Sequence, residues 1–366
     1  MRLASGGVPD FHLTRRHLLA SPLALAACGS APSTPPLGPV RPLKDLTTVP
    51  VGVCGMSGQF GDAGWRRVVL THFSQFTPEW EMKMEAILRP DRSLDFTLAD
   101  RCADFATDHG LRLHGHALIW YSQGAEAFAG LDRKTFAADY DRYVREVTGH
   151  YRGRAVGWDV VNEAVAEDGN GLRTHHWSET LGEIDHIRRA FDVAHDADPQ
   201  AVLFLNDYNL ENLPGKGATF LNLVEKLLRA GTPLGGIGSQ SHLDIEIPEG
   251  QITAFMRDAA GFGLPIHVSE LDASLRSDRR VDLRSPAERQ AQQTARVTEL
   301  AEAFAALPPA QQYAFTVWGA RDTDSWLRRD DRDDGRDSPL LFDASGMATP
   351  LYDAVAGPLG SARLGQ

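Results

Sequence analysis

The stretch GWDVVNEAV, from Gly157 to Val165, has the pattern of a strand that ends abruptly in polar residues. Its centre is apolar and β-branched, which is typical of a strand buried in a sheet. Asn162 and Glu163 then interrupt the apolar run. An amide and a carboxylate at the end of an interior strand lie where the core meets solvent. The stretch therefore predicts a sheet whose strand ends form a site.

Seven further runs of this kind occur along the chain, separated by longer amphipathic stretches. They span residues 49–55, 73–79, 111–120, 201–207, 236–243, 265–272 and 313–319. In stretches such as 217–231 and 285–307, apolar residues recur every three or four positions, as in a helix. Ser285, Pro286 and Glu288 predict the start of the second of these helices.

Eight strands that alternate with helices favour parallel βαβ units. A single closed (β/α)₈ TIM barrel is the simplest α/β architecture for that number of strands. An open, doubly wound sheet is the alternative, and it would favour a glycine-rich phosphate loop after an early strand. No such loop is evident in the sequence.

The predicted strand ends are unusually rich in polar and aromatic residues. They carry Glu79, His116, Trp120, Asn162, Glu163, Asn206, Asp207, Gln240, His242, Glu270 and Trp318. In a barrel these ends meet at one mouth. A single carboxylate there could merely cap the following helix, but the same trend at seven strand ends predicts a functional site.

Glu163 and Glu270, on the fourth and seventh predicted strands, are the two acids that stand out. Across a barrel mouth one carboxyl could donate a proton while the other attacks, as in a retaining glycosidase. Trp120, Trp318 and Trp326 offer flat apolar faces for sugar rings. Trp158, which lies within the same predicted strand as Asn162, is expected in the core.

Composition excludes some classes of partner. The chain has 366 residues and a formal net charge of −12. This acidic balance argues against nucleic acid or an anionic membrane as the main partner. No spaced cysteines and histidines suggest structural zinc, and we expect no disulfide between Cys54 and Cys102 because both lie in predicted core elements.

Residues 1–27 have the pattern of a targeting segment that lies outside the fold. Arg15 and Arg16 precede an apolar run, which resembles a twin-arginine export signal. The run ends in LAACG, residues 25–29, which resembles a lipobox with Cys28 as the lipidated residue. An ordinary cleaved signal with an incidental cysteine is the alternative. We expect an exported protein, either a periplasmic or cell-surface lipoprotein or otherwise a secreted one.

The rest of the chain divides into two expected parts. Residues 28–47 are rich in proline and small residues, and we expect them to form a linker. Residues 48–360 are expected to form one catalytic barrel domain, without a second low-complexity break.

Eight motifs, in order along the chain, resemble those of glycoside hydrolase family 10, the retaining β-1,4-xylanases. They are TPEWEMKME (77–85), LDFTLADR (94–101), GHALIW (115–120), WDVVNEAV (158–165), NDYN (206–209), GIGSQSHL (236–243), SELD (269–272) and TVWGARDTDSW (316–326). The resemblance covers residues from about 50 to 355. It implies an endo-acting hydrolase that cleaves β-1,4 linkages in xylan by double displacement, with no cofactor and no metal.

The resemblance also implies a role for each matching residue. Glu163 matches the general acid/base and Glu270 the nucleophile. Asn162 matches the amide that binds the sugar 2-hydroxyl, and His242 the imidazole that hydrogen-bonds the nucleophile. The other matching positions bind substrate: Glu79, Lys83, His116 and Trp120 on the non-reducing side, Trp318 and Trp326 as the aromatic floor and lid of those same subsites, Tyr208 on the leaving-group side, and Gln240, expected on the same strand face as His242.

Two residues depart from the family pattern. Trp80 stands where the family usually has an asparagine that contacts a sugar hydroxyl, and Tyr121 stands in place of a histidine. These changes leave open a retaining β-glycanase that acts on another polysaccharide, such as a decorated or bacterial exopolysaccharide. A transglycosylase and a non-catalytic glycan-binding surface lipoprotein are further alternatives. We expect a monomer that contacts a membrane only through its lipid anchor.

Overall fold

The structure is a computed structural model that describes residues 40–276, 282–329 and 335–364. Cys28 and the expected export signal lie outside these residues. Among the described helices, none combines the length and the apolar character needed to cross a membrane.

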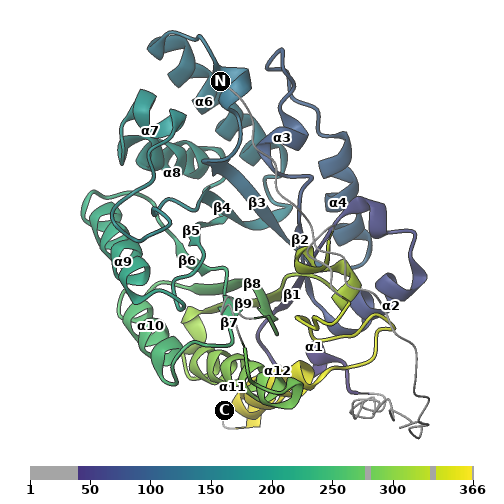
Figure 1. Ribbon diagram of the computed structural model, residues 1–366. Coiled ribbons are helices and arrows are strands. Elements are labelled where there is room, and N and C mark those ends of the chain that lie inside the picture. Colours follow the sequence, from purple (N-terminus) through teal and green to yellow (C-terminus); the bar gives the residue numbers. More distant parts are fainter. Residues whose placement is uncertain (1–39, 277–281, 330–334, 365–366) are drawn as a thin grey trace, which may run out of the picture. The chain divides into compact units, whose positions relative to one another are not determined.

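Parallel strands close into a barrel, so the expected (β/α)₈ architecture is confirmed (Figure 1). The strands are β1 (Val51–Gly55), β2 (Gln75–Pro78), β3 (Arg112–Trp120), β4 (Ala155–Asn162), β5 (Val202–Asp207), β6 (Gly236–Ser239), β7 (His242–Asp244), β8 (Ile266–Ser274) and β9 (Gln312–Val317). Neighbours pair in parallel from β1 to β6, then β6 with β8, β8 with β9 and β9 with β1.

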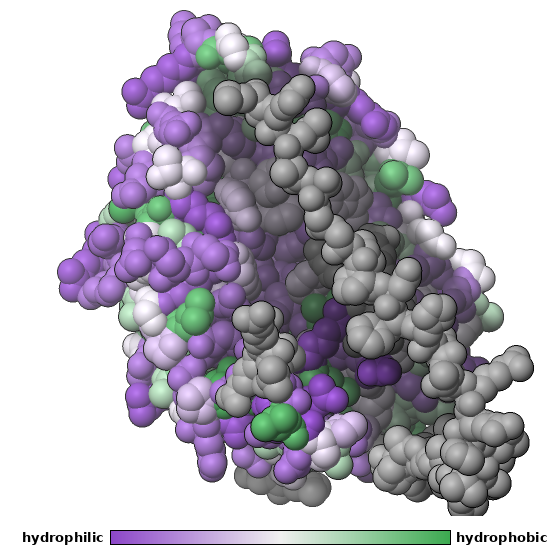
Figure 2. Space-filling view, in the orientation of Figure 1, coloured by the Kyte–Doolittle hydropathy of each residue, from purple (hydrophilic) through white to green (hydrophobic). Residues whose placement is uncertain are grey.

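The helices form a ring outside the strands (Figure 1). They are α1 (Leu43–Leu46), α2 (Ala63–His72), α3 (Met84–Ile87), α4 (Thr97–Asp108), α5 (Ala125–Phe128), α6 (Arg133–His150), α7 (His176–Leu181), α8 (Asp185–Ala197), α9 (Pro214–Arg229), α10 (Gln251–Ala260), α11 (Pro286–Ala305) and α12 (Pro350–Leu364). Figure 2 shows the same face of the molecule as predominantly hydrophilic and hollowed toward its centre.

The predicted start of α11 is confirmed. The Ser285 hydroxyl oxygen accepts a hydrogen bond from the backbone N–H of Glu288 at 3.3 Å, and the Glu288 carboxylate accepts one from the backbone N–H of Ser285 at 2.7 Å. This reciprocal arrangement satisfies two donors that a helix end otherwise leaves unpaired.

The sixth strand differs from the single run expected over residues 236–243. It ends at Ser239 and resumes at His242, because Ser241 has a φ of 54° in the left-handed region. The buried carboxylate of Glu211 holds the break by accepting hydrogen bonds from the hydroxyls of Ser239 and Ser241, at 2.6 and 2.7 Å. The two halves, β6 and β7, both pair with β8.

Residues 43–46, which were expected in the linker, form α1 and pack on the domain. The Leu43 side chain is completely buried, and α1 contacts α2 and α12. The Lys44 ammonium donates a hydrogen bond to the Leu70 carbonyl at 2.7 Å. A buried leucine and a fixed ammonium are features of a packed element, so the folded part begins before residue 48.

Packing between the strands and the helices explains Trp158 of the quoted stretch, whose ring lies 5.9 Å from that of Tyr151 at the end of α6. Trp158 is completely buried, as expected for a core side chain. The facing residue on β3 is Gly115, and a Cβ there would lie 2.2 Å from the Trp158 ring. The glycine therefore provides the space that the indole fills. Cys54 and Cys102 are both buried and unbridged.

Candidate active site

Glu163 follows the last residue of β4, where the chain leaves the barrel. Its φ of 61° lies in the left-handed region, which is uncommon for a residue with a side chain. Its backbone N–H donates to the Asn206 carbonyl at 2.8 Å and so ties the turn to β5. Strained backbone of this kind is concentrated at functional sites.

Three donors converge on the Glu163 carboxylate. The Trp120 indole N–H donates to Oε2 at 2.8 Å. The amides of Asn162 and Gln240 both donate to Oε1 at 3.1 Å. The four residues come from β3, β4 and the break after β6, so neighbouring strand ends assemble this half of the site.

Glu270 lies within β8 and is 4% exposed. Its Oε1 accepts a hydrogen bond from the Asn206 amide at 2.9 Å. Its Oε2 lies 3.6 Å from Nε2 of His242, and Nδ1 of His242 lies 2.9 Å from the Asp272 carboxylate. The imidazole is therefore held between two buried acids.

The charges around Glu270 keep it anionic. Burial raises the pKa of Glu270, but His116, His242 and Lys83 together outweigh that effect and hold the pKa below its ordinary value. Burial lowers the pKa of His242, yet Asp272 and Glu270 raise it to about 10. At neutral pH the group is thus an imidazolium beside a carboxylate.

Asn206, at the end of β5, connects the two acids. Its amide N–H₂ donates to Asn162 at 2.9 Å and to Glu270 at 2.9 Å. Its carbonyl oxygen accepts a hydrogen bond from the Ser269 hydroxyl at 2.7 Å. Because Asn162 in turn donates to Glu163, a continuous chain of hydrogen bonds links Glu163 to Glu270.

His116 is buried beneath this chain. Its Nδ1 lies 2.8 Å from the Asp159 carboxylate, and its ring packs edge-on against Trp318 at 5.3 Å between centres. Burial raises the pKa of Asp159, but His114 and His116 hold it below its usual range. Asp159 is therefore an anion, and its carboxylate fixes the orientation of the His116 ring.

Lys83 and Trp326 each contact a partner of one acid, Trp120 for Glu163 and His242 for Glu270. The Lys83 ammonium lies 4.8 Å from the centre of the Trp120 ring, a cation–π distance. The Trp326 indole N–H donates to Asp272 at 2.8 Å, and its ring lies 5.5 Å from that of His242. A cavity of about 610 Å³ adjoins Trp326, His242 and Asp272.

Tyr208 reaches the site through Arg173. The Arg173 guanidinium donates to the Tyr208 hydroxyl at 2.6 Å and to the backbone carbonyl of Glu163 at 3.0 Å. It also lies 4.2 Å from the centre of the Tyr121 ring. Tyr121, one of the two departures from the family pattern, thus packs against the residue that supports Glu163.

Glu79, at the end of β2, is paired rather than free. The guanidinium of Arg329 donates to both carboxylate oxygens, at 2.6 and 2.8 Å. Arg329 follows the short helix η4 (Trp326–Arg328), in the segment after β9. The neighbouring Trp80 is 41% exposed.

The residues that the sequence singled out therefore lie around one mouth. No sequence pattern assigned an individual role to Asn206, Asp159, Asp272, Arg173 or Arg329, although Asn206 was among the polar strand ends. Asp272 was detectable, because it lies two residues after Glu270 and side chains two apart in a strand share a face. The two arginines lie in loops, where no periodicity marks them.

One buried cluster has metal-ligand residue types. Ligand atoms of His114, Asp159 and His267 lie within 4.8 Å of one another inside the barrel. His114 Nδ1 lies 3.1 Å from the Tyr313 hydroxyl, and His267 Nε2 lies 2.8 Å from that of Thr316. These contacts account for the cluster as a hydrogen-bond network within the barrel.

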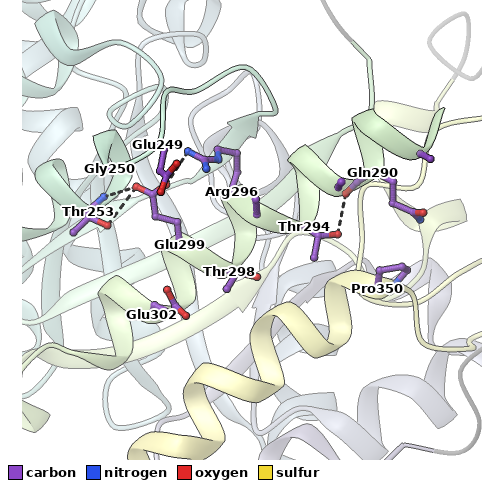
Figure 3. Close-up of a pocket in the computed structure, with 13 residues that line it drawn as sticks. Glu249, Gly250, Thr253, Gln290, Thr294, Arg296, Thr298, Glu299, Glu302 and Pro350 are labelled. Atoms are coloured by element: carbon purple, nitrogen blue, oxygen red, sulfur yellow. Dashed lines mark hydrogen bonds and ion pairs between the residues drawn. The ribbon is translucent and has the colours of Figure 1, made fainter. Parts of the chain in front are cut away.

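A second cavity, of about 840 Å³, lies between α10 and α11 (Figure 3). Of the three acids that line it, Glu249, Glu299 and Glu302, Glu299 accepts hydrogen bonds from Thr253 and pairs with Arg296 at 2.8 Å. Although it is larger than the cavity beside His242, no residue from the strand ends lines it. Size alone therefore does not identify the site.

Comparisons with known proteins agree with this geometry. The model for glycosyl hydrolase family 10 matches residues 44–358. A β-1,4-xylanase from Dictyoglomus thermophilum is 35% identical over 74% of this chain and 78% of its own length. Two other curated relatives are longer, and the chain spans 26% and 27% of their lengths.

Solved structures show the same likeness. A thermostable mutant of a xylanase from Cellvibrio japonicus has a TM-score of 0.79 and 30% identity, over 87% of this chain and 99% of that one. A mutant of another xylanase from the same organism, in complex with xylopentaose, has a TM-score of 0.79 and 27% identity, over 88% of this chain and 69% of that one.

Proposed function

The chain belongs to glycosyl hydrolase family 10, and from this premise we propose that it is a retaining endo-β-1,4-xylanase. The observation that carries the proposal is the hydrogen-bond chain from Glu163 through Asn162 and Asn206 to Glu270. It holds two carboxylates in fixed relation within one mouth. A double displacement needs that arrangement.

Glu270 is the proposed nucleophile. Its lowered pKa keeps it ionised, and the adjacent imidazolium of His242 stabilises the anion. The carboxylate attacks the anomeric carbon and forms a glycosyl ester, with cleavage of the bond to the leaving oxygen. Asn206 orients Glu270 through its 2.9 Å hydrogen bond.

Glu163 is the proposed general acid and then general base. It donates a proton to the leaving oxygen and later removes one from the water that hydrolyses the ester. Trp120 and Gln240 position its carboxylate. Asn162 is placed between the acids, where an amide can bind the sugar 2-hydroxyl and strengthen that bond in the transition state.

The names of the Dictyoglomus thermophilum and Cellvibrio japonicus relatives support xylan as the substrate. The chain spans only about a quarter of the length of two longer relatives. The substrate of the whole protein is therefore part of this proposal. The exposed Trp80 is the feature that favours a second candidate, another β-linked polysaccharide, since an indole offers a donor but no acceptor to a sugar hydroxyl.

The test is a screen of the purified protein against xylan, mixed-linkage glucan, cellulose and a bacterial exopolysaccharide. We expect release of reducing ends from xylan, with the β-anomer formed first in proton NMR. Glu270→Ala should lower turnover by more than about a thousandfold. Turnover of another glycan in preference to xylan would support the second candidate, and gain of xylan activity by Trp80→Asn would identify Trp80 as its cause.

We further propose that the protein is exported and anchored through Cys28, with a polysaccharide as its only macromolecular partner. The twin-arginine-like segment and the LAACG stretch, residues 25–29, support this location. A Cys28→Ser variant should move from the membrane fraction to the soluble fraction of the expressing cells. Equal distribution of both proteins would contradict the anchor.

A further inference from the structure

We propose that Arg329 sets how many sugars the cleft accepts on the β2 side of the site, by occupying Glu79. This inference rests on the proposed function and names a residue that determines substrate length. It starts from Glu79, whose two carboxylate oxygens are both engaged by Arg329.

The contact between Arg329 and Glu79 is a two-pronged ion pair. Both carboxylate oxygens accept hydrogen bonds, at 2.6 and 2.8 Å, and the Asp324 carbonyl accepts a third from the same guanidinium at 3.0 Å. The Glu79 side chain is only 11% exposed, whereas that of Arg329 is 36% exposed. Arg329 therefore lies on the solvent side of the pair and covers the carboxylate.

The order of the strands places this pair on one side of the acids. From β4, which positions Glu163, one arc of the barrel runs through β3, β2, β1 and β9 to β8, which carries Glu270. Glu79 and Arg329 follow β2 and β9, so they belong to this arc. The 610 Å³ cavity is lined mainly by residues in or after β5, β7 and β8, together with Trp326 and Leu327 from the segment after β9.

The pair also lies within electrostatic range of the site. Burial raises the pKa of Cys54, and the carboxylates of Glu79 and Glu270 both raise it further, whereas Arg329 opposes them. The charges of the ion pair and of the proposed nucleophile thus both act on the pKa of the same buried thiol, Cys54. Lys83, four residues after Glu79, lies over the Trp120 ring, whose indole N–H binds Glu163, so the wall that carries the pair adjoins the acids.

The wall beside Glu79 offers donors and few acceptors. The Lys83 ammonium lies 5.7 Å from the centre of the Trp80 ring and 4.8 Å from that of Trp120. An ammonium and an indole N–H donate hydrogen bonds and accept none. A carboxylate is the strongest acceptor available for sugar hydroxyls there, and Arg329 holds both oxygens of Glu79.

A second sugar on this side must therefore displace Arg329 or bind without the carboxylate. Charge-assisted two-pronged hydrogen bonds are among the stronger polar contacts in proteins. In the native enzyme a second sugar on this side should consequently raise kcat/KM only a little. Once Arg329 is removed, the second sugar can bind Glu79 and should raise kcat/KM more.

The experiment compares two substrates with the same leaving group, para-nitrophenyl β-xyloside and para-nitrophenyl β-xylobioside. The first places one sugar on the β2 side and the second places two. In Arg329→Ala the ratio of kcat/KM for xylobioside to that for xyloside should rise by about tenfold or more. Arg329→Lys keeps the charge but cannot make the two-pronged contact. Its ratio should lie between those of the native protein and Arg329→Ala.

A double-mutant comparison shows whether Arg329 acts through Glu79. The gain from Arg329→Ala should vanish in a Glu79→Ala background, because no carboxylate is then released. Arg257→Ala, which removes an exposed arginine from α10, should leave the ratio unchanged. Circular dichroism and thermal melts show whether each variant is folded.

Two failures are distinguishable. If neither aryl glycoside nor xylan is hydrolysed by the native protein, the proposed function is wrong. The inference about Arg329 is overturned if the native protein hydrolyses aryl glycoside and xylan but a folded Arg329→Ala leaves the xylobioside-to-xyloside ratio unchanged. It is also overturned if Trp80→Asn raises that ratio and Arg329→Ala does not.

Discussion

Glu163 and Glu270 are the same amino acid in two different surroundings, and that difference supports their proposed roles. Glu270 is buried beside a cationic His242, which favours a permanent anion. Glu163 is partly exposed and receives only neutral donors, from Trp120, Asn162 and Gln240. Pairs of acids whose environments differ in this way divide acid and nucleophile between them.

Glu163→Ala should slow xylan hydrolysis strongly and spare the first step with activated aryl glycosides. An aryl leaving group departs without a proton, so loss of the acid matters little for glycosylation. We expect a drop of about a hundredfold or more on xylan, and a burst of nitrophenol followed by slow turnover on the aryl xyloside. Stopped-flow absorbance measures both phases.

The control for this variant is addition of azide, a small nucleophile that needs no general base. Azide should accelerate the slow phase in Glu163→Ala and form the β-glycosyl azide, whereas any azide product of Glu270→Ala should be the α-anomer. Equal loss of both substrates in a folded Glu163→Ala protein would show that the acid/base role belongs elsewhere.

His242→Asn should move the acid limb of the pH–activity profile to higher pH. The imidazolium helps to lower the pKa of Glu270, so its removal leaves burial less opposed and the pKa rises. At a given low pH a smaller fraction of Glu270 is then anionic. The profile of kcat/KM for aryl xyloside reports this group in the free enzyme.

The matched control is His195→Asn, which changes an exposed histidine near the end of α8. Its acid limb should coincide with that of the native enzyme. An unchanged limb in His242→Asn as well would show that His242 does not govern the ionisation of Glu270.

The sequence predicted the residues of the site better than their connections. Glu163, Asn162 and Glu270 were found because polar residues at the ends of apolar strands are conspicuous. The bridging role of Asn206 depends on the register between β4 and β5, which pairs it with Asn162. The Arg329–Glu79 contact joins residues 250 positions apart through a loop, and no sequence pattern encodes that approach.

Among the elements, regular ones followed from the sequence and interruptions did not. Alternation of apolar runs with amphipathic stretches predicted the barrel strands and α11. The break after β6 was missed because serine is tolerated in strands, and its cause is the distant acid Glu211 that binds both hydroxyls. The break brings Gln240 to Glu163 while His242 faces Glu270, so an irregular element serves both acids.

Gly115→Ala should strongly destabilise the contact between β3 and β4. The added methyl group would lie 2.2 Å from the fully buried Trp158, and neither backbone nor indole has room to move. We expect a loss of about 2–3 kcal/mol in the free energy of unfolding, measured by urea denaturation, as for other overpacked cores.

The paired control is Gly149→Ala in α6, where the new methyl group meets no atom within 4 Å. A helix favours alanine over glycine, so this variant should be as stable as the native protein or more stable. If both variants unfolded alike, the argument from the Trp158 contact would fail.

At the scale of the whole molecule, the two ends of the barrel have different tasks. The residues after the strands carry the site, whereas α1 precedes β1 and lies toward the start of the strands. Side chains at that end of a TIM barrel contribute to stability rather than to chemistry. Burial and Lys44 lower the pKa of His72 to about 4, so its neutral ring can accept the Leu43 backbone N–H at 3.3 Å.

A chain that starts at residue 48 should therefore be less stable than one that starts at residue 40, yet equally active while folded. The shorter chain loses the buried Leu43, the Lys44–Leu70 bond and the 2.5 Å bond from the Tyr352 hydroxyl to the Arg41 carbonyl. Burial of one leucine alone is worth about 2 kcal/mol. Urea denaturation at pH 7.5 should show at least that difference.

The difference between the two chains should shrink as the pH falls from about 6.5 toward 4. The folded pKa of His72 lies below its unfolded value, so its contribution is complete above the unfolded pKa and is lost as pH falls through the folded one. In the shorter chain, His72 lacks both Leu43 and the Lys44 ammonium, so its protonation lowers the free energy of unfolding by less than in the longer chain. Equal stability of the two chains at pH 7.5 would place residues 40–47 in the linker, as the sequence alone had indicated.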